Sequence, residues 1–240
     1  MKLSLEIPTV YLIDFSPLCD LDFVLAHRVL EDERYADFFF RRPKGRELIL
    51  DNSMHELGGN PLSVGEIGEA AKRCRADYVC APDKLGEVQK NLDWFKDTHR
   101  LLGDQFKIAT VLTGHDGPQR SQFLQNVRHA DMLCLAYRTP RLDWFKEHSQ
   151  ELITYFSRIH LFGVNELEEL RSFSERPLHH FSVDTGKPIK WGVQKERLNR
   201  TGGIRHAPLP SLDLLSVRSL SCAQMEAVLW NIAYLRTFIT

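Results

Sequence analysis

The sequence is poor in cysteine, and its cysteines form no recognisable pair. The five stand singly along the chain, at Cys19, Cys74, Cys80, Cys134 and Cys222. An odd number without any C-x-x-C or C-x-C spacing argues against a disulfide framework. We therefore expect reduced thiols and a cytoplasmic protein, in the host cell cytoplasm if the chain is viral.

Long apolar runs and biased segments are also missing. No stretch approaches the ~18 apolar residues that cross a bilayer, and the N-terminus lacks the basic start and apolar core of a signal peptide. There is no low-complexity segment, no repeat of fixed period and no Pro/Gly-rich linker. We expect one soluble domain over residues 1–240, without a membrane partner.

Neither sign of charge is in excess, since 31 Lys and Arg residues oppose 32 Asp and Glu residues. Binding to a polyanion must therefore come from local basic patches. One candidate is RRPKGR at 41–46. The other interleaves a tryptophan with basic residues, at Lys187, Lys190, Trp191, Lys195, Arg197 and Arg200. A solvated loop face is the usual role of such a run, but this one also suits phosphates and a stacked base.

Short apolar or β-branched runs recur between segments of helical period. Their positions are 10–14, 48–51, 77–83, 107–114, 131–137, 159–164 and 179–184. Ser63 with Glu66 is a capping box, and a final helix is expected over residues 221–238. Apolar strands that alternate with helices predict a parallel sheet. Seven or eight strands in this length favour an α/β fold, a single (β/α)8 TIM-like barrel. An open doubly wound sheet is the alternative, because no eighth strand is obvious before about 206–216.

Four of the expected strands end in aspartate, at Asp14, Asp51, Asp83 and Asp184. The carboxyl ends of barrel strands form the reactive face, so these acids are expected on one rim. Each alone is explained by the frequent use of Asp in loops and helix caps. Two carboxylates that flank an anomeric carbon can perform a double displacement, which makes sugar transfer a natural use of such a rim.

The histidines allow a competing interpretation. His55 and His115, with a carboxylate, are conceivable metal ligands, although a satisfied polar contact is the default role for each. We expect no bound metal, because no His or Cys ligand pattern accompanies the acids.

These motifs, taken in order, resemble the tRNA-guanine transglycosylase superfamily, most closely its short phage members, the 7-deazaguanine DNA transglycosylases. LDNSMHE at 50–56 matches the family's T-D-S-G-G-F-Q and places Asp51 on the proton-transfer acid. DTGKPIK at 184–190 is similar to D-C-V-x-P-T-R and places Asp184 on the covalent nucleophile. HLFGVN at 160–165 is similar to Y-L-M-G-V-G, and Asp83 falls where a base-recognising Asp stands. The match runs from about residue 10 to 190.

The resemblance implies a glycosyltransferase (pentosyltransferase) that exchanges guanine in DNA for a free 7-deazaguanine base, without a cofactor. The guanine is flipped from the stack, Asp184 attacks C1′, and Asp51 takes the proton of the incoming base. Asp83 accepts hydrogen bonds from the purine edge. Further residues of the base pocket are expected to be Asn52, Asp14, Thr113, Tyr137 and Gly163.

The sequence departs from the family at several places. LTGH at 112–115 replaces V-Q-G-G, so Thr113 stands where a base-reading Gln is found. CLAYRTP at 134–140 replaces G-G-L-A-V-G-E, and Ser53 and Met54 replace two glycines. The C-x-C-x-x-C zinc motif of the tRNA enzymes is missing, so no structural zinc is predicted and tRNA is the less expected substrate. A tRNA or nucleoside transglycosylase, or a non-catalytic nucleic-acid-binding barrel, remain the alternatives.

Overall fold

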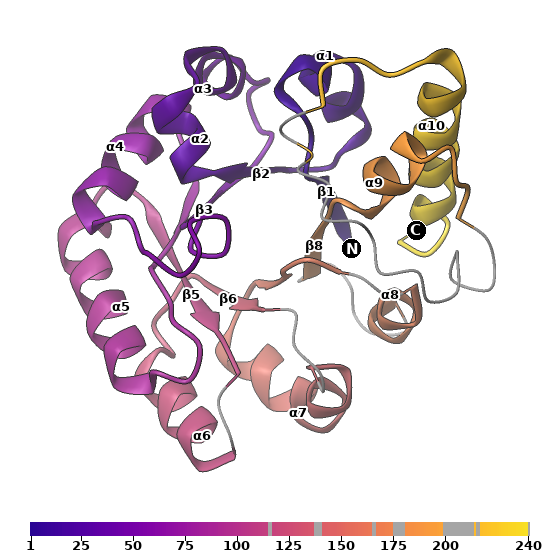
Figure 1. Ribbon diagram of the computed structural model, residues 1–240. Helices are drawn as coiled ribbons and strands as arrows, with labels where there is room; N and C mark the ends of the chain where they lie inside the picture. The colour runs from indigo at the N-terminus through magenta and orange to yellow at the C-terminus, as the bar shows by residue number, and fades with distance from the viewer. Residues whose placement is uncertain are drawn as a thin grey trace. The chain divides into compact units, whose positions relative to one another are not determined.

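The computed structural model describes residues 1–114, 117–136, 141–164, 167–174, 181–198, 214 and 217–239. Eight parallel strands alternate with helices along the chain, in the sheet order β1-β8-β7-β6-β5-β4-β3-β2 (Figure 1). This arrangement is an α/β fold of the (β/α)8 TIM-like barrel class, which confirms the predicted fold class. The chain divides into two compact units, which we call the terminal unit (Met1–Asp20 and Gly163–Thr240) and the central unit (Leu21–Phe162). The prediction of a single domain stays a prediction.

The terminal unit contains two strands that pair in parallel. β1 (Lys2–Leu5) lies beside β8 (Phe181–Thr185), with Ser4 opposite Asp184. The helices are α1 (Leu12–Phe15), α8 (Leu167–Ser174), α9 (Lys187–Val193) and α10 (Cys222–Arg236), with 3-10 turns at Thr9–Tyr11 and Ser16–Leu18. α9 and α10 pack against each other, which places the last helix on the segment that follows β8.

The central unit contains six consecutive parallel strands with helices along their outer side (Figure 1). The strands are β2 (Asp22–Leu25), β3 (Leu48–Asp51), β4 (Tyr78–Cys80), β5 (Lys107–Leu112), β6 (Met132–Leu135) and β7 (Ile159–Leu161). The helices are α2 (Ala26–Glu31), α3 (Glu33–Phe40), α4 (Val64–Cys74), α5 (Val88–Leu102), α6 (Gly117–Asn126) and α7 (Arg141–Tyr155).

The core of the central unit follows the two-residue alternation of its strands. The inward-facing cluster consists of Leu21, Ile49, Tyr78, Cys80, Ala109, Val111, Met132 and Cys134. Side chains two residues apart on a strand share a face, so Asp51 continues the row of Ile49 and Thr113 continues the row of Val111. The apolar cluster therefore ends in polar side chains at the carboxyl ends of β3 and β5.

Most sequence-based element predictions are confirmed. The runs at 48–51, 77–83, 107–114, 131–137 and 159–164 each contain a strand, and 179–184 overlaps β8. The Ser63 hydroxyl and the Glu66 backbone form the expected capping box of α4, and α10 is the expected final helix. The stretch 206–216 lies outside the described residues apart from Leu214.

The prediction of a strand at 10–14 is wrong. Those residues form a 3-10 turn and α1, in which Leu12 and Phe15 are buried while Ile13 and Asp14 are exposed. Burial at a spacing of three residues is helical, and the apolar run was too short to distinguish the two periods. The first two strands lie instead at 2–5 and 22–25, so LILD is the third strand of the fold rather than the second.

Candidate active site

A hydrogen-bonded cluster of buried polar side chains lies at the carboxyl ends of β3, β4 and β5 in the central unit. The Asn52 side-chain amide donates to Oδ1 of Asp83 at 2.9 Å and to the carbonyl oxygen of Ala81 at 2.7 Å. The Thr113 hydroxyl donates to Oδ2 of the same carboxylate. Asp83 is only 9% exposed, so burial and these two donors hold its carboxylate in one orientation. Three residues expected in the base pocket are thus brought together.

Asp51 is positioned by the turn that ends β3. Its Oδ2 accepts the backbone N–H of Ser53 at 2.8 Å, and Asn52 Oδ1 accepts that of Met54 at 2.9 Å. Two successive Asx turns of this kind end the strand and satisfy the N–H groups of Ser53 and Met54. Ser53 takes φ 60°, and its buried hydroxyl accepts the backbone N–H of His27 at 3.2 Å. Ser53 therefore adopts the left-handed backbone conformation that favours glycine.

A pair of thiols lies near the two carboxylates. Cys80 and Cys134 are fully buried, with their sulfur atoms 3.9 Å apart. The hydrogen bond to Cys134 raises the pKa of Cys80 well above its ordinary value, and burial and the charges of Cys134, Asp51 and Asp83 raise it further. Cys80 is therefore a neutral part of the core and is unsuited to act as a nucleophile.

Asp184 lies in the terminal unit, near the end of β8, and is buried. Its Oδ1 accepts the backbone N–H of Gly163 at 3.0 Å, and its carbonyl oxygen accepts that of Val164 at 3.0 Å. Thr185 also holds the loop after β7 against β8, because its hydroxyl donates to the Val164 carbonyl oxygen at 2.8 Å. On β8, Asp184 shares a face with the buried Ser182, opposite the apolar Val183 and Phe181. The backbone of the loop after β7 thus orients this carboxylate.

Three further residues were expected in the base pocket. Asp14 is exposed on α1, so the prediction that it ends a strand is wrong. Gly163 takes φ 57° and contributes its backbone N–H to Asp184. Tyr137 lies outside the described residues.

The basic segment of the terminal unit differs from its prediction in one respect. Trp191 is 5% exposed, so the expected accessible ring is not available for stacking. Lys190 pairs with Glu6 at 3.5 Å, and Arg197 pairs with Glu226 at 2.5 Å. Lys195 is exposed, Lys187 is half-buried, and Arg200 lies outside the described residues.

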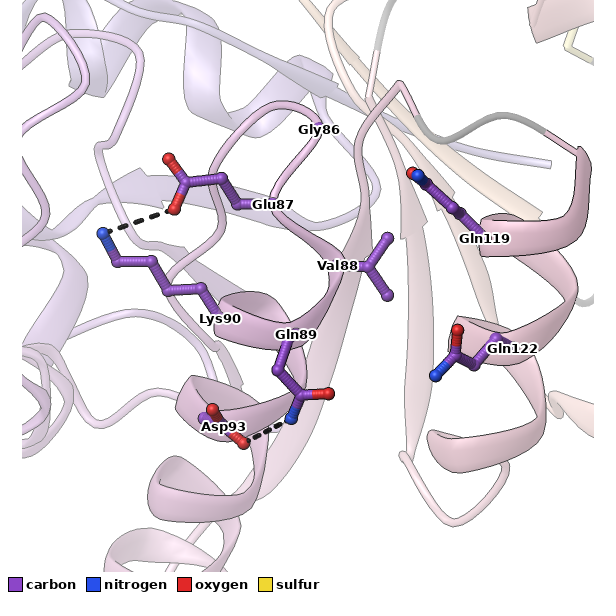
Figure 2. A pocket seen from close by; sticks show the side chains of 8 residues that line it. All are labelled: Gly86, Glu87, Val88, Gln89, Lys90, Asp93, Gln119 and Gln122. Atoms are coloured by element: carbon purple, nitrogen blue, oxygen red, sulfur yellow. Dashed lines mark hydrogen bonds and ion pairs between the residues drawn. The ribbon is translucent and has the colours of Figure 1, made fainter.

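A polar groove of about 600 Å³ lies between α5 and α6 (Figure 2). It is lined by Gly86, Glu87, Val88, Gln89, Lys90, Asp93, Gln119 and Gln122. Gln119 and Gln122 extend from α6 toward α5, and Val88 points back toward them. Glu87 pairs with Lys84 and Lys90, and Gln89 donates to Asp93. The groove contains none of the buried aspartates and is separate from the cluster around Asp83.

The histidines give no support to a metal site. His55 is exposed, His115 lies outside the described residues, and the buried His160 stacks on Phe23 with ring centroids 5.2 Å apart. Among the described residues no group of three or more His, Cys, Asp or Glu side chains is arranged to hold a metal ion. The described helices also include none long and apolar enough to span a membrane.

Sequence reasoning missed the contribution of the main chain to the site. The Ala81 carbonyl oxygen accepts a hydrogen bond from the Asn52 side chain, and the Gly163 N–H donates one to Asp184. Every residue has such backbone groups, so the identity of Ala81 or Gly163 in the sequence does not predict these contacts. The Asx turn of Asn52 has a local signal, since Asp-Asn-Ser after an apolar run is typical of a turn.

Comparison of the chain with protein-family models finds no match, and comparison with curated proteins finds none either. The conclusions on the site therefore depend on the chemistry of its residues.

Proposed function

We propose that the protein is a base-exchange glycosyltransferase. It replaces guanine in DNA with a 7-deazaguanine, such as 7-cyano-7-deazaguanine, through a covalent aspartyl–sugar intermediate. The observation that carries this proposal is the buried, doubly anchored carboxylate of Asp83, with Asp51 close by at the end of the neighbouring strand.

Asp83 is suited to recognise a guanine-like base. Its carboxylate oxygens accept hydrogen bonds from Asn52 and Thr113, and a carboxylate oxygen can accept more than one donor. The N1–H and 2-amino groups of guanine present two parallel donors that match one carboxylate, whereas adenine has no N1–H. The Asp83 carboxylate is already removed from water, so a base without these two donors would leave it without hydrogen bonds from the base. A site of this kind therefore rejects such bases.

The proposed reaction is a retaining double displacement. An oxygen of Asp184 bonds to C1′ while the C1′–N9 bond breaks, and guanine leaves with the electron pair and takes a proton from solvent. The incoming base then loses its N9 proton to Asp51 and attacks C1′, which breaks the ester and restores Asp184. No atom is oxidised or reduced, and the glycosidic bond is exchanged rather than hydrolysed. The guanine must leave the stack first, because C1′ is not accessible to a carboxylate while the base is paired.

The test is incubation with guanine-containing DNA and isotopically labelled 7-cyano-7-deazaguanine, followed by mass spectrometry of the released nucleosides. We expect label in DNA with the wild-type protein and none with Asp184→Asn. Asp51→Asn is expected to accumulate the covalent DNA adduct on Asp184. Asp104→Asn is a matched control, because Asp104 is an exposed aspartate after α5, away from the cluster.

Absence of both incorporation and adduct would contradict the proposal. The same assay on a tRNA transcript separates the substrates: label in tRNA but not in DNA would establish the tRNA enzyme instead. A protein that binds DNA equally well before and after Asp184→Asn, and exchanges no base in either form, would be a non-catalytic binder.

A further inference from the structure

A half-exposed tryptophan lies on α10 in the terminal unit. Trp230 is 50% exposed, beside Leu229 at 44%. The guanidinium of Arg197 lies over the indole, 5.3 Å from the ring centroid, and also pairs with Glu226. The indole N–H donates to the carbonyl oxygen of Leu198 at 3.4 Å. Because this polar atom has a partner, the part of Trp230 that meets solvent is the aromatic surface.

A buried asparagine holds this ring in place. Asn231 is 0% exposed, and its Oδ1 accepts the backbone N–H of Leu198 at 2.6 Å. Its side-chain amide donates to the carbonyl oxygens of Glu196 at 2.9 Å and Pro188 at 3.2 Å. Three backbone groups are thus tied to the residue that follows Trp230. The indole is therefore a fixed surface beside the segment after α9.

That segment is strongly basic. Residues 187–205 contain six basic residues and one acidic residue, Glu196. Lys195 is exposed and takes φ 63° at the turn that ends α9, and Arg197 contacts the indole directly. An aromatic surface beside cations is the combination by which proteins hold a nucleic-acid strand, with bases stacked on the ring and phosphates near the charges.

We infer that Trp230 and Arg197 form a stacking platform for the DNA strand on which the exchange takes place, an inference that rests on the proposed function. A base next to the exchanged guanosine stacks on the indole, and Lys195 and Arg197 lie against the phosphates. The stacking role that the sequence indicates for Trp191 belongs to Trp230, which α10 brings to the same basic segment. Lys195 and Arg197 are the described cations beside the indole, and cations of this kind suit the phosphates of a nucleic acid.

The test measures binding of a fluorescent guanine-containing oligonucleotide by anisotropy, together with the exchange assay. Trp230→Ala is expected to weaken binding about tenfold, the order expected for one lost base–ring stack. The loss is expected in KM for DNA rather than in kcat. Trp230→Phe keeps a ring and is expected to recover most of the affinity. Leu229→Ala is the matched control, since it removes a similarly exposed apolar side chain from the same helix, and it is expected to bind within about twofold of wild type.

The outcomes separate this inference from the proposed function. Exchange by the wild type with unchanged binding by Trp230→Ala overturns the platform alone. Binding that depends on Trp230 without any base exchange overturns the proposed function and keeps the platform. Equal losses of DNA affinity in Leu229→Ala and Trp230→Ala would show that stacking on the indole does not hold the DNA. A dimer that Trp230→Ala dissociates without a change in DNA affinity would show that this face binds a second copy of the chain. Either result would overturn the inference.

Discussion

The side-chain amide of Asn52 donates a 2.9 Å hydrogen bond to Oδ1 of Asp83 across two neighbouring strands of the central unit. The amide donates this hydrogen bond without bringing a charge of its own to the site. Replacing the amide by a carboxylate keeps the shape and reverses the interaction.

Asn52→Asp is therefore expected to raise KM for the incoming base about tenfold or more, because two carboxylates at this distance must share a proton. The shared proton removes one acceptor from the guanine-binding edge. Steady-state exchange kinetics at varied base concentration measure the effect. Asn60→Asp, at an exposed position in the same loop, is the control. An unchanged KM in Asn52→Asp would show that Asp83 does not bind the base.

Asn231→Ala is expected to lower the free energy of unfolding by about 2–4 kcal/mol, because it leaves buried backbone groups of three residues without their partner. Urea denaturation measures the change. Asn126→Ala removes an exposed amide from α6 and is expected to cost less than about 0.5 kcal/mol. Equal small effects in both variants would contradict the anchoring role.

The cysteines are expected to differ sharply in reactivity. Burial raises the pKa of Cys74 to about 12, and Cys80 is raised well above its ordinary value, mainly by the hydrogen bond to Cys134. Cys222 is exposed at the start of α10. Iodoacetamide at pH 8 is therefore expected to add one group to the native chain, at Cys222, and five to the denatured chain. Mass spectrometry counts the additions. Any rapid label on the native Cys222→Ser variant would contradict the burial of the other four cysteines.

His129 makes the protein less stable in mild acid. Partial burial lowers the pKa of His129 below its ordinary value of 6.5, and the nearby His99 lowers it further. As pH falls below 6.5 the unfolded chain binds a proton that the folded chain still excludes, so stability is lost as pH decreases toward the folded pKa. NMR titration should find His129 below 6.5, and His99→Gln should raise its pKa. A lower pKa of His129 in the His99→Gln variant would contradict the conclusion that His99 lowers that pKa.

Sequence patterns predicted a strand or helix correctly where residues within that element were enough to identify it. LILD, the Ser63 capping box and the final helix were all predicted because apolar period and cap residues act over a few neighbours. The strand at 22–25 was missed for the same reason. It runs directly into α2, so the apolar residues of the two elements merge into one helix-like stretch.

By itself, the sequence determined the alternation of strands and helices, favoured a TIM-like barrel over an open doubly wound sheet, and placed Asp51 and Asp184 at or near strand ends. Only the tertiary structure decided which polar residues meet and which rings stay accessible. Thr113 reaches Asp83 because β4 and β5 pair in parallel, and Trp191 is buried while Trp230 is exposed because α10 packs on α9. Such contacts join residues far apart in the chain. They depend on strand register and helix packing, which the apolar periodicity of a single segment does not reveal.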